Sequence, residues 1–135
     1  MTTSLFAAQE SVYGALTASS TLQGLIGNPA RVYDSVPAVA TYPYLTLGDV
    51  LVRDYDTKEQ SGFEQTIVLH AYSRYRGRQE LKAIMQAAYD ALHNASLTVT
   101  GATFVTCQFQ QASTSLDNDG LTSHGVMRFR LVVQH

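Results

Sequence analysis

Residues 125–133 alternate between apolar positions and positions that include Arg128 and Arg130. The apolar set is Met127, Phe129, Leu131 and Val133. Because successive side chains of a strand point to opposite faces, this pattern predicts a strand with one apolar face and one face carrying two guanidinium groups. Such a strand belongs to a sheet that buries one face in a core and presents the other to solvent, nucleic acid or another subunit.

Three further segments, 42–52, 64–74 and 104–112, have the alternation or the composition of strands, and 31–33 is a candidate for a brief one. The residues predicted to face the core are Leu45 and Leu47, then Ile67, Leu69 and Ala71, then Val105, Cys107 and Phe109. Pro43 has to sit at the start of its strand or on an edge, because proline donates no hydrogen bond to a ladder. The very polar segment 53–62 is predicted to be a long hairpin loop, and 117–120 a turn.

Two segments have the period of amphipathic helices. In residues 4–18 the apolar stripe is predicted to consist of Leu5, Val12 and Leu16, widened by Phe6 and Tyr13. In residues 77–93 it consists of Leu81, Ile84, Met85, Ala88 and Leu92, with Gly77 as N-cap and Asn94 as stop. A short helical turn through residues 22–26 is expected to end at 27–29.

The order helix, strand, strand, helix, strand, strand predicts an α+β fold. We expect a mostly antiparallel sheet with two main helices packed on one face, in a single domain that spans residues 1–135.

The composition favours an oligomer over an isolated domain. Charged residues make up only 15% of the chain, which has 8 tyrosines and no tryptophan. Charge depletion with tyrosine enrichment is typical of subunit interfaces. The net charge of −2 argues against a dedicated nucleic-acid binder. Neither a signal peptide nor a membrane-spanning stretch is apparent, so we expect a soluble protein made in the cytoplasm, without a membrane partner.

No pattern of catalytic or metal-binding residues stands out. The carboxylates Asp54, Asp56 and Glu59 lack the glycine and terminal glutamate of a calcium loop, and Asp117 to Gly120 has the residues of a turn. The four histidines, His70, His93, His124 and His135, lack zinc-motif spacing. Cys107 is predicted to be a buried apolar residue. We therefore expect no enzyme activity, no metal and no cofactor.

A small basic cluster of Arg74, Arg76 and Arg78 is interleaved with Tyr72 and Tyr75. Arginine and aromatic residues together can bind single-stranded nucleic acid, but three arginines neutralise too few phosphates for tight binding. The interpretation we favour is a subunit contact with the carboxylates of segment 54–59 of a neighbour, because a guanidinium pairs well with carboxylates.

Three motifs resemble a known family. They are Tyr42-Pro43-Tyr44-Leu45-Thr46-Leu47-Gly48, the strand-to-helix junction from Leu69 through Arg74 to Lys82, and the closing turn and strand from Asp119 to Arg130. In this order they are similar to the tail terminator, or tail completion, group of long-tailed phages and gene transfer agents. The resemblance spans nearly the whole chain.

The resemblance implies a structural virion protein. Members form a ring, commonly a hexamer, that docks on the last ring of the tail tube, stops tube polymerisation and offers its other face to head-completion or neck proteins. Genome DNA passes through the lumen without specific binding. The implied location is the tail–neck junction of a virion assembled in the host cytoplasm, and the family supplies no catalytic residues.

Interface residues are predicted among the charged loops and the last strand. They are Arg53, Asp54, Asp56, Lys58, Glu59, Arg74, Arg76, Arg78, Asp117, Asp119, Arg128 and Arg130. Two alternatives stay open at this point. One is another neck component, such as a head-completion or stopper protein, and the other is a small nucleic-acid-binding module that uses Arg74, Arg76, Arg78, Arg128 and Arg130.

Overall fold

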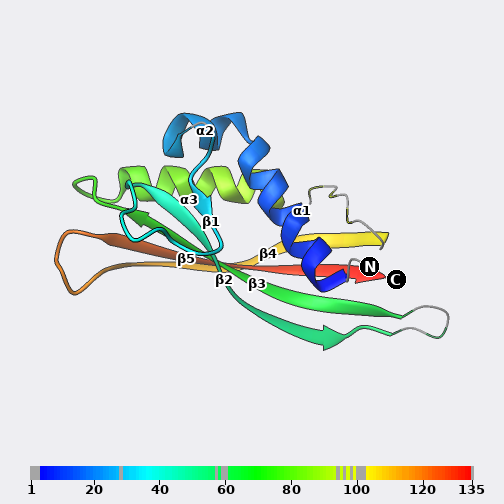
Figure 1. The fold of residues 1–135 in the computed structure, drawn as a ribbon. Coiled ribbons are helices and arrows are strands. Elements are labelled where there is room, and N and C mark those ends of the chain that lie inside the picture. The colour runs from blue at the N-terminus through cyan, green and yellow to red at the C-terminus, as the bar shows by residue number, and fades with distance from the viewer. Residues whose placement is uncertain are drawn as a thin grey trace.

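A five-stranded sheet with helices on one of its faces forms the molecule (Figure 1). The computed structural model describes residues 4–27, 29–56, 58, 61–93, 95, 97, 99 and 103–134. Its elements are α1 (Ser4–Ala18), α2 (Ser20–Ile26), β1 (Val32–Tyr33), β2 (Tyr44–Asp54), β3 (Gly62–Ser73), α3 (Gln79–Leu92), β4 (Thr103–Leu116) and β5 (Ser123–Gln134). This arrangement confirms the predicted α+β class, with the short predicted turn forming the helix α2.

The strand order across the sheet is β1-β2-β3-β5-β4. The short β1 runs parallel to β2, and every other neighbouring pair is antiparallel. β1 pairs with β2 only at Leu45 and Thr46, so it leaves the distal half of β2 without a partner on that side. Among the described residues no helix is long and apolar enough to cross a membrane.

The core lies between the helices and the sheet. Leu16 of α1 and Ile84 of α3 are completely buried, as are Leu45 of β2 and Leu131 of β5. Burying each of these side chains contributes roughly 2 kcal/mol to folding. The predicted stripe of α3 and the predicted core faces of β2, β3 and β5 are confirmed.

The predicted stripe of α1 is wrong at two positions. Phe6 and Tyr13 are 57% and 44% exposed, whereas Ala8 is buried beside Val12. The small alanine lets the helix approach the core closely, and the large aromatic rings that the pattern placed on the stripe lie outside it. The side chain of Leu5 lies outside the described residues.

Val105 does not share the face of Cys107 and Phe109. The register of β4 against β5 shifts between Phe104 and Thr106, so Phe104 packs against the core and Val105 is 45% exposed. A bulge inserts one residue into a strand and thereby inverts the alternation beyond it. A second shift, between Phe109 and Gln111, places Gln111 opposite Arg128.

Element ends differ slightly from the predictions. Arg53 and Asp54 continue β2, because Glu64 and Phe63 lie opposite them, so the hairpin loop is shorter than predicted. Helix α3 begins at Gln79, and Gly77, with φ of 82°, forms the turn before it instead of the cap. The predicted stop at Asn94 lies outside the described residues.

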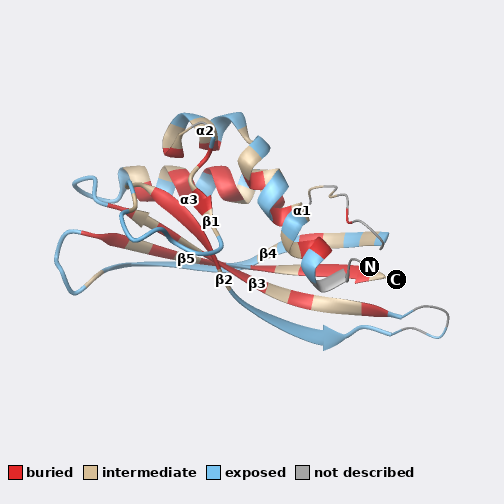
Figure 2. Ribbon diagram, viewed as in Figure 1, coloured by how far each residue is buried: buried red, intermediate tan, exposed pale blue. Residues whose placement is uncertain are grey.

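Burial is uneven along the sheet. The strands are buried beneath the helices, whereas the distal part of β2, residues 50–54, and the second half of β4, residues 110–116, are exposed (Figure 2). The sheet is therefore longer than the helical layer that covers it.

Candidate assembly surface

Aromatic rings gather on the sheet face opposite the helices. Tyr44 of β2 lies with its ring centroid 5.1 Å from that of Tyr72 on β3, and Tyr72 stacks on His124 of β5 at 4.5 Å. Tyr42 and Tyr33 contact Tyr44 at 5.0 and 5.7 Å. Alternate residues of adjacent strands produce this aromatic patch, which we define as Tyr33, Tyr42, Tyr44, His70, Tyr72 and His124. Burial raises the pKa of Tyr44 to about 12, so its hydroxyl stays protonated.

Two histidines of this patch form a direct hydrogen bond. Nδ1 of His70 lies 2.8 Å from Nε2 of His124, so one imidazole donates and the other accepts. Nδ1 of His124 also lies 3.5 Å from a carboxylate oxygen of Asp117. Burial, and next the neighbouring His124, lower the pKa of His70. A residue with a side chain does not fit at Gly48, because its Cβ would lie 2.7 Å from Cδ2 of His70.

Arg128 and Arg130 occupy the predicted face but in different states. Arg130 Nη2 lies 2.9 Å from an oxygen of Glu64, and this hydrogen bond raises the pKa of the guanidinium. Arg128 is exposed and forms no ion pair with any described residue. The face therefore carries one neutralised and one available positive charge.

Arg74 is held within its own chain. Its Nη2 lies 3.8 Å from Asp119, its Nε donates to the Thr122 hydroxyl at 3.2 Å, and the guanidinium lies over the Tyr42 ring. The turn at 117–120 thus brings a partner from the same chain to this arginine, and its contact with a neighbour's carboxylates stays a prediction. Arg76 and Arg78 are exposed and form no ion pair in the described part of the chain.

Asp119 organises the turn between β4 and β5. Its oxygens accept hydrogen bonds from the backbone N–H groups of Leu121 and Thr122 and from the Thr122 hydroxyl. The backbone donors, that of Thr122 first, lower the pKa of the carboxyl to about 2. Gly120, with φ of 70°, supplies the left-handed conformation of the turn. The turn interpretation of this segment is therefore confirmed.

The hairpin loop after β2 is tied by Asp56, which accepts a hydrogen bond from the backbone N–H of Gly62 at 3.1 Å. Arg53, Asp54 and Lys58 are exposed, and Glu59 lies outside the described residues. The described residues contain no group of three or more histidine, cysteine or acidic side chains that could hold a metal ion. Burial raises the pKa of the Cys107 thiol to about 11, which keeps it protonated.

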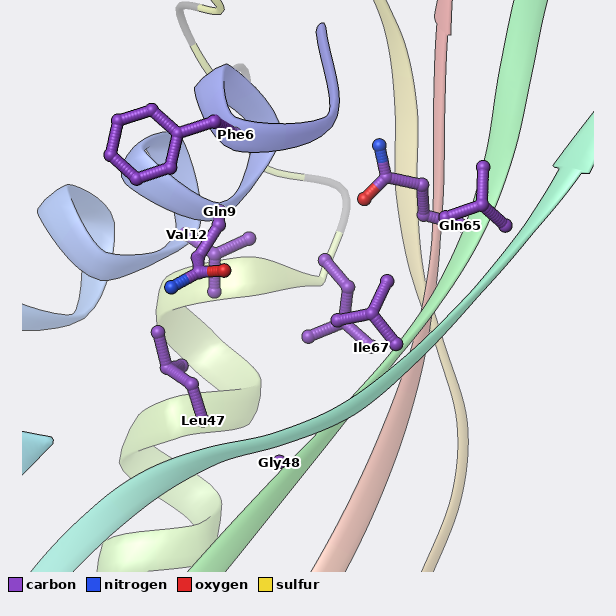
Figure 3. Close-up of a pocket in the computed structure, with 9 residues that line it drawn as sticks. Phe6, Gln9, Val12, Leu47, Gly48, Gln65 and Ile67 are labelled. Atoms are coloured by element: carbon purple, nitrogen blue, oxygen red, sulfur yellow. The ribbon is translucent and has the colours of Figure 1, made fainter. Parts of the chain in front are cut away.

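A groove lies between α1 and the distal half of the β2–β3 hairpin. It has a volume of about 350 Å³. Its walls include Phe6, Gln9, Val50, Val52 and Gln65 (Figure 3). The side chain of Gln65 is buried, yet its amide nitrogen has no hydrogen-bond partner among the described residues. The groove is apolar and carries one unsatisfied donor.

Sequence reasoning missed the histidine pair and the groove. His70 and His124 are separated by 54 residues, and only the register that sets Tyr72 opposite His124 brings them together. His70 falls on the face of the predicted strand 64–74 opposite Ile67 and Leu69, whereas His124 precedes the predicted strand 125–133, so no sequence pattern indicated the pair. The groove depends on the angle at which α1 crosses the sheet, and no local pattern encodes that angle.

Comparisons with known proteins agree with the motifs. The family model of "Tail completion protein gp17" matches residues 10–134. The tail completion protein gp17 of Bacillus phage SPP1 is 30% identical over 94 residues, which cover 70% of this chain and 69% of that protein.

Two solved structures resemble the fold. A chain of the virion of a native gene transfer agent particle superposes with a TM-score of 0.90 at 27% identity, covering 100% of both chains. The structure of bacteriophage SPP1 gp17 gives a TM-score of 0.64 at 25% identity, covering 94% of this chain and 90% of that one.

Proposed function

The chain belongs to the tail completion protein gp17 family, and we propose that it is the ring-forming tail terminator of its particle. The family is a structural one, with relatives in a phage and in the virion of a gene transfer agent. In the proposed role the protein caps the tail tube, stops its polymerisation and joins the tail to the head or neck.

The observation that carries this proposal is the full-length match to a chain of an assembled gene transfer agent virion, with a TM-score of 0.90. A fold shared over its whole length with a chain of an assembled particle supports a structural role within a virion. The aromatic patch, with little charge, is also a surface that can be covered at low desolvation cost.

The proposal also covers the number of subunits, their partners and their place in the particle. The ring is a hexamer, one side of it meets the tail tube protein, and the other meets a head-completion or neck protein. Genome DNA passes through its lumen without specific binding, and the protein has no enzyme activity. Its location is the tail–neck junction of a virion assembled in the host cytoplasm.

The predicted interface residues that the structure describes divide into three groups in this proposal. Those that shape loops are Asp56, Arg74, Asp117 and Asp119. Those that are exposed and available to a neighbouring subunit or the tail tube are Arg53, Asp54, Lys58, Arg76, Arg78 and Arg128. Arg130 is already paired with Glu64 and sets the local shape of the sheet.

A nucleic-acid-binding module is the weaker alternative. With Arg74 occupied by Asp119 and Arg130 by Glu64, only three arginines of that set stay available, and phosphate affinity grows with the number of neutralised phosphates. We expect binding to DNA at physiological salt to be negligible in a salt titration.

Binding experiments test the proposed role. The purified protein is mixed separately with polymerised tail tube protein and with the portal-side neck proteins, and co-sedimentation and light scattering are measured. A tail terminator binds tube ends and limits further growth of the tube. Binding to neck proteins without any binding to tube ends would instead identify a stopper or head-completion protein.

A further inference from the structure

Strand β4 is an edge strand that lacks most of the usual protection of an edge, although two bulges interrupt it and the backbone N–H of Phe109 donates to Nδ1 of His93 at 3.1 Å. It runs for 14 residues and contains no charged residue and no proline. Monomeric proteins shield such edges with lysine, proline or a covering element, because the free N–H and C=O groups pair readily with another strand. The two bulges interrupt the ladder with β5 but place no charge on the outer side.

The opposite end of the sheet has a second open edge. β1 covers β2 only at Leu45 and Thr46, and beyond it the strand continues to Asp54. There Val50, Leu51 and Val52 are 42%, 55% and 36% exposed. Three adjacent exposed aliphatic residues on an open edge are a ready site for an added strand.

The apolar groove adjoins this second edge. Val50 and Val52 belong both to the open part of β2 and to the groove wall. A strand added beside β2 would therefore place alternate side chains against the groove, next to the unsatisfied amide of Gln65. The groove and the edge therefore form one continuous surface.

The open edge of β2 and the edge strand β4 are compatible in strand direction and in position along the strand axis. Three successive antiparallel pairings make β2 and β4 of one chain antiparallel, so a neighbouring copy in the same orientation would continue the antiparallel sheet. The registers connect Leu51 through Thr66 and Arg130 to Gln108, so Leu51 and Gln108 lie at the same level on the face opposite the helices.

We propose that the distal half of β2 in one copy pairs with β4 of the next copy, and that this contact closes the ring. The inference rests on the proposed ring-forming function and specifies its subunit interface. The contact is heterologous, since it joins two different surfaces, and such contacts generate rings when the rotation closes. Because the helices take up more space than the bare sheet face, they lie on the outside of the ring and the aromatic patch faces inward.

Engineered disulfides test this pairing in assembled particles. Leu51→Cys is combined in turn with Thr106→Cys, Gln108→Cys and Gln111→Cys, which lie on the same face of β4 at successive levels. Cys107 can stay in place, because its thiol is buried and protonated. The matched control combines Leu51→Cys with Asp90→Cys on the exposed side of α3. Thermal unfolding of each purified variant verifies that it folds.

Particles carrying the variants are oxidised and resolved by non-reducing electrophoresis. We expect one β2–β4 pair to give a ladder of covalent multimers that ends at the ring size, with the control remaining monomeric. Multimers seen by a general amine cross-linker, without a disulfide ladder for any pair, would overturn the edge pairing and leave the ring. Absence of multimers with both reagents would overturn the ring and the pairing together, and a disulfide from Leu51→Cys to a tail tube protein would assign this edge to the tube.

Discussion

At the scale of single residues, the His70–His124 hydrogen bond makes the fold sensitive to pH. One imidazole must accept, so protonation of both rings breaks the bond and places two positive charges together. Arg128 and Asp49 also act on His70, the first lowering and the second raising its pKa, but burial is the largest cause of the lowered value. Burial resists protonation of His70, so acid weakens the pair.

The lowered pKa of His70 gives a pH dependence with a definite sign. The unfolded chain binds a proton near pH 6.5, whereas the folded chain resists it, so stability is complete above about pH 6.5 and falls as the pH decreases through the lowered folded-state value. We expect the melting temperature of the wild type to decrease by roughly 2–5 °C more than that of His70→Gln between pH 7.5 and 5. Parallel curves for the two proteins in differential scanning calorimetry would contradict this assignment.

Two phenylalanines, one in the core and one at the surface, provide a test of the packing. Phe129 is 1% exposed and meets the ring of Phe109 edge-on at 5.7 Å, so Phe129→Ala should lower the free energy of unfolding by about 3–5 kcal/mol. Phe6→Ala is the control, because Phe6 is 57% exposed, and it should cost less than about 1 kcal/mol. Urea denaturation measures the free energy of unfolding of both variants. A large decrease for Phe6→Ala would contradict the exposed position of Phe6 and support the wide buried stripe that the sequence predicted for α1.

At the scale of elements, the sequence predicted where the strands lie better than it predicted their bulges and the faces of individual side chains. The alternation at 64–74 and 125–133 placed β3 and β5 correctly, because both strands lie in the middle of the sheet and bury one face along their whole length. The bulges in β4 were not predictable, since a bulge is defined by the partner strand. Val105 was therefore placed on the wrong face.

The helices show the same division. The stripe of α3 was predicted correctly, because that helix packs against the middle of the sheet and against α2. For α1 the helical period allowed two stripes, and the choice between Ala8 and the aromatic rings was decided by how closely the helix approaches the core. The small volume of Ala8, more than its hydrophobicity, therefore explains why it and not an aromatic ring faces the core.

The open edge of β2 provides a prediction at this scale. Leu51→Lys introduces a charge where an added strand would pack, as lysines on natural edges do. We expect the free energy of unfolding of the isolated protein to change by no more than about 0.5 kcal/mol, because Leu51 is exposed, while incorporation into particles is lost. Thr21→Lys on the exposed side of α2 is the control and should be incorporated normally, as measured by immunoblotting of purified particles. Normal incorporation of Leu51→Lys would count against the edge as an interface.

At the scale of the whole molecule, the candidate surface was only half predictable. The face with Arg128 and Arg130 followed from alternation, whereas the partners of Arg74 and Arg130 depend on contacts 45 and 66 residues apart in the chain. Those contacts turn several predicted interface charges into loop-shaping residues. The charges that stay available lie at the ends of the sheet and on the face opposite the helices, which faces inward in the proposed ring.

The sheet is longer than its helical cover, and both of its edges are open. In an isolated domain this arrangement leaves an uncharged strand and three aliphatic residues unprotected. In the proposed ring, β4 of one copy covers the distal half of β2 in the next copy. The two edges that are exposed in a monomer are then buried in the subunit interface. The geometry of the sheet therefore agrees with the ring that we propose for this member of the tail completion family.

The length of tails made without this protein tests that role most directly. Particles are produced with its gene deleted, and tail lengths are measured by electron microscopy beside those of the complemented strain. The account predicts overlong tails of widely varying length without attached heads, and recovery of uniform tails on complementation. Tails of normal, uniform length in the absence of the protein would contradict it.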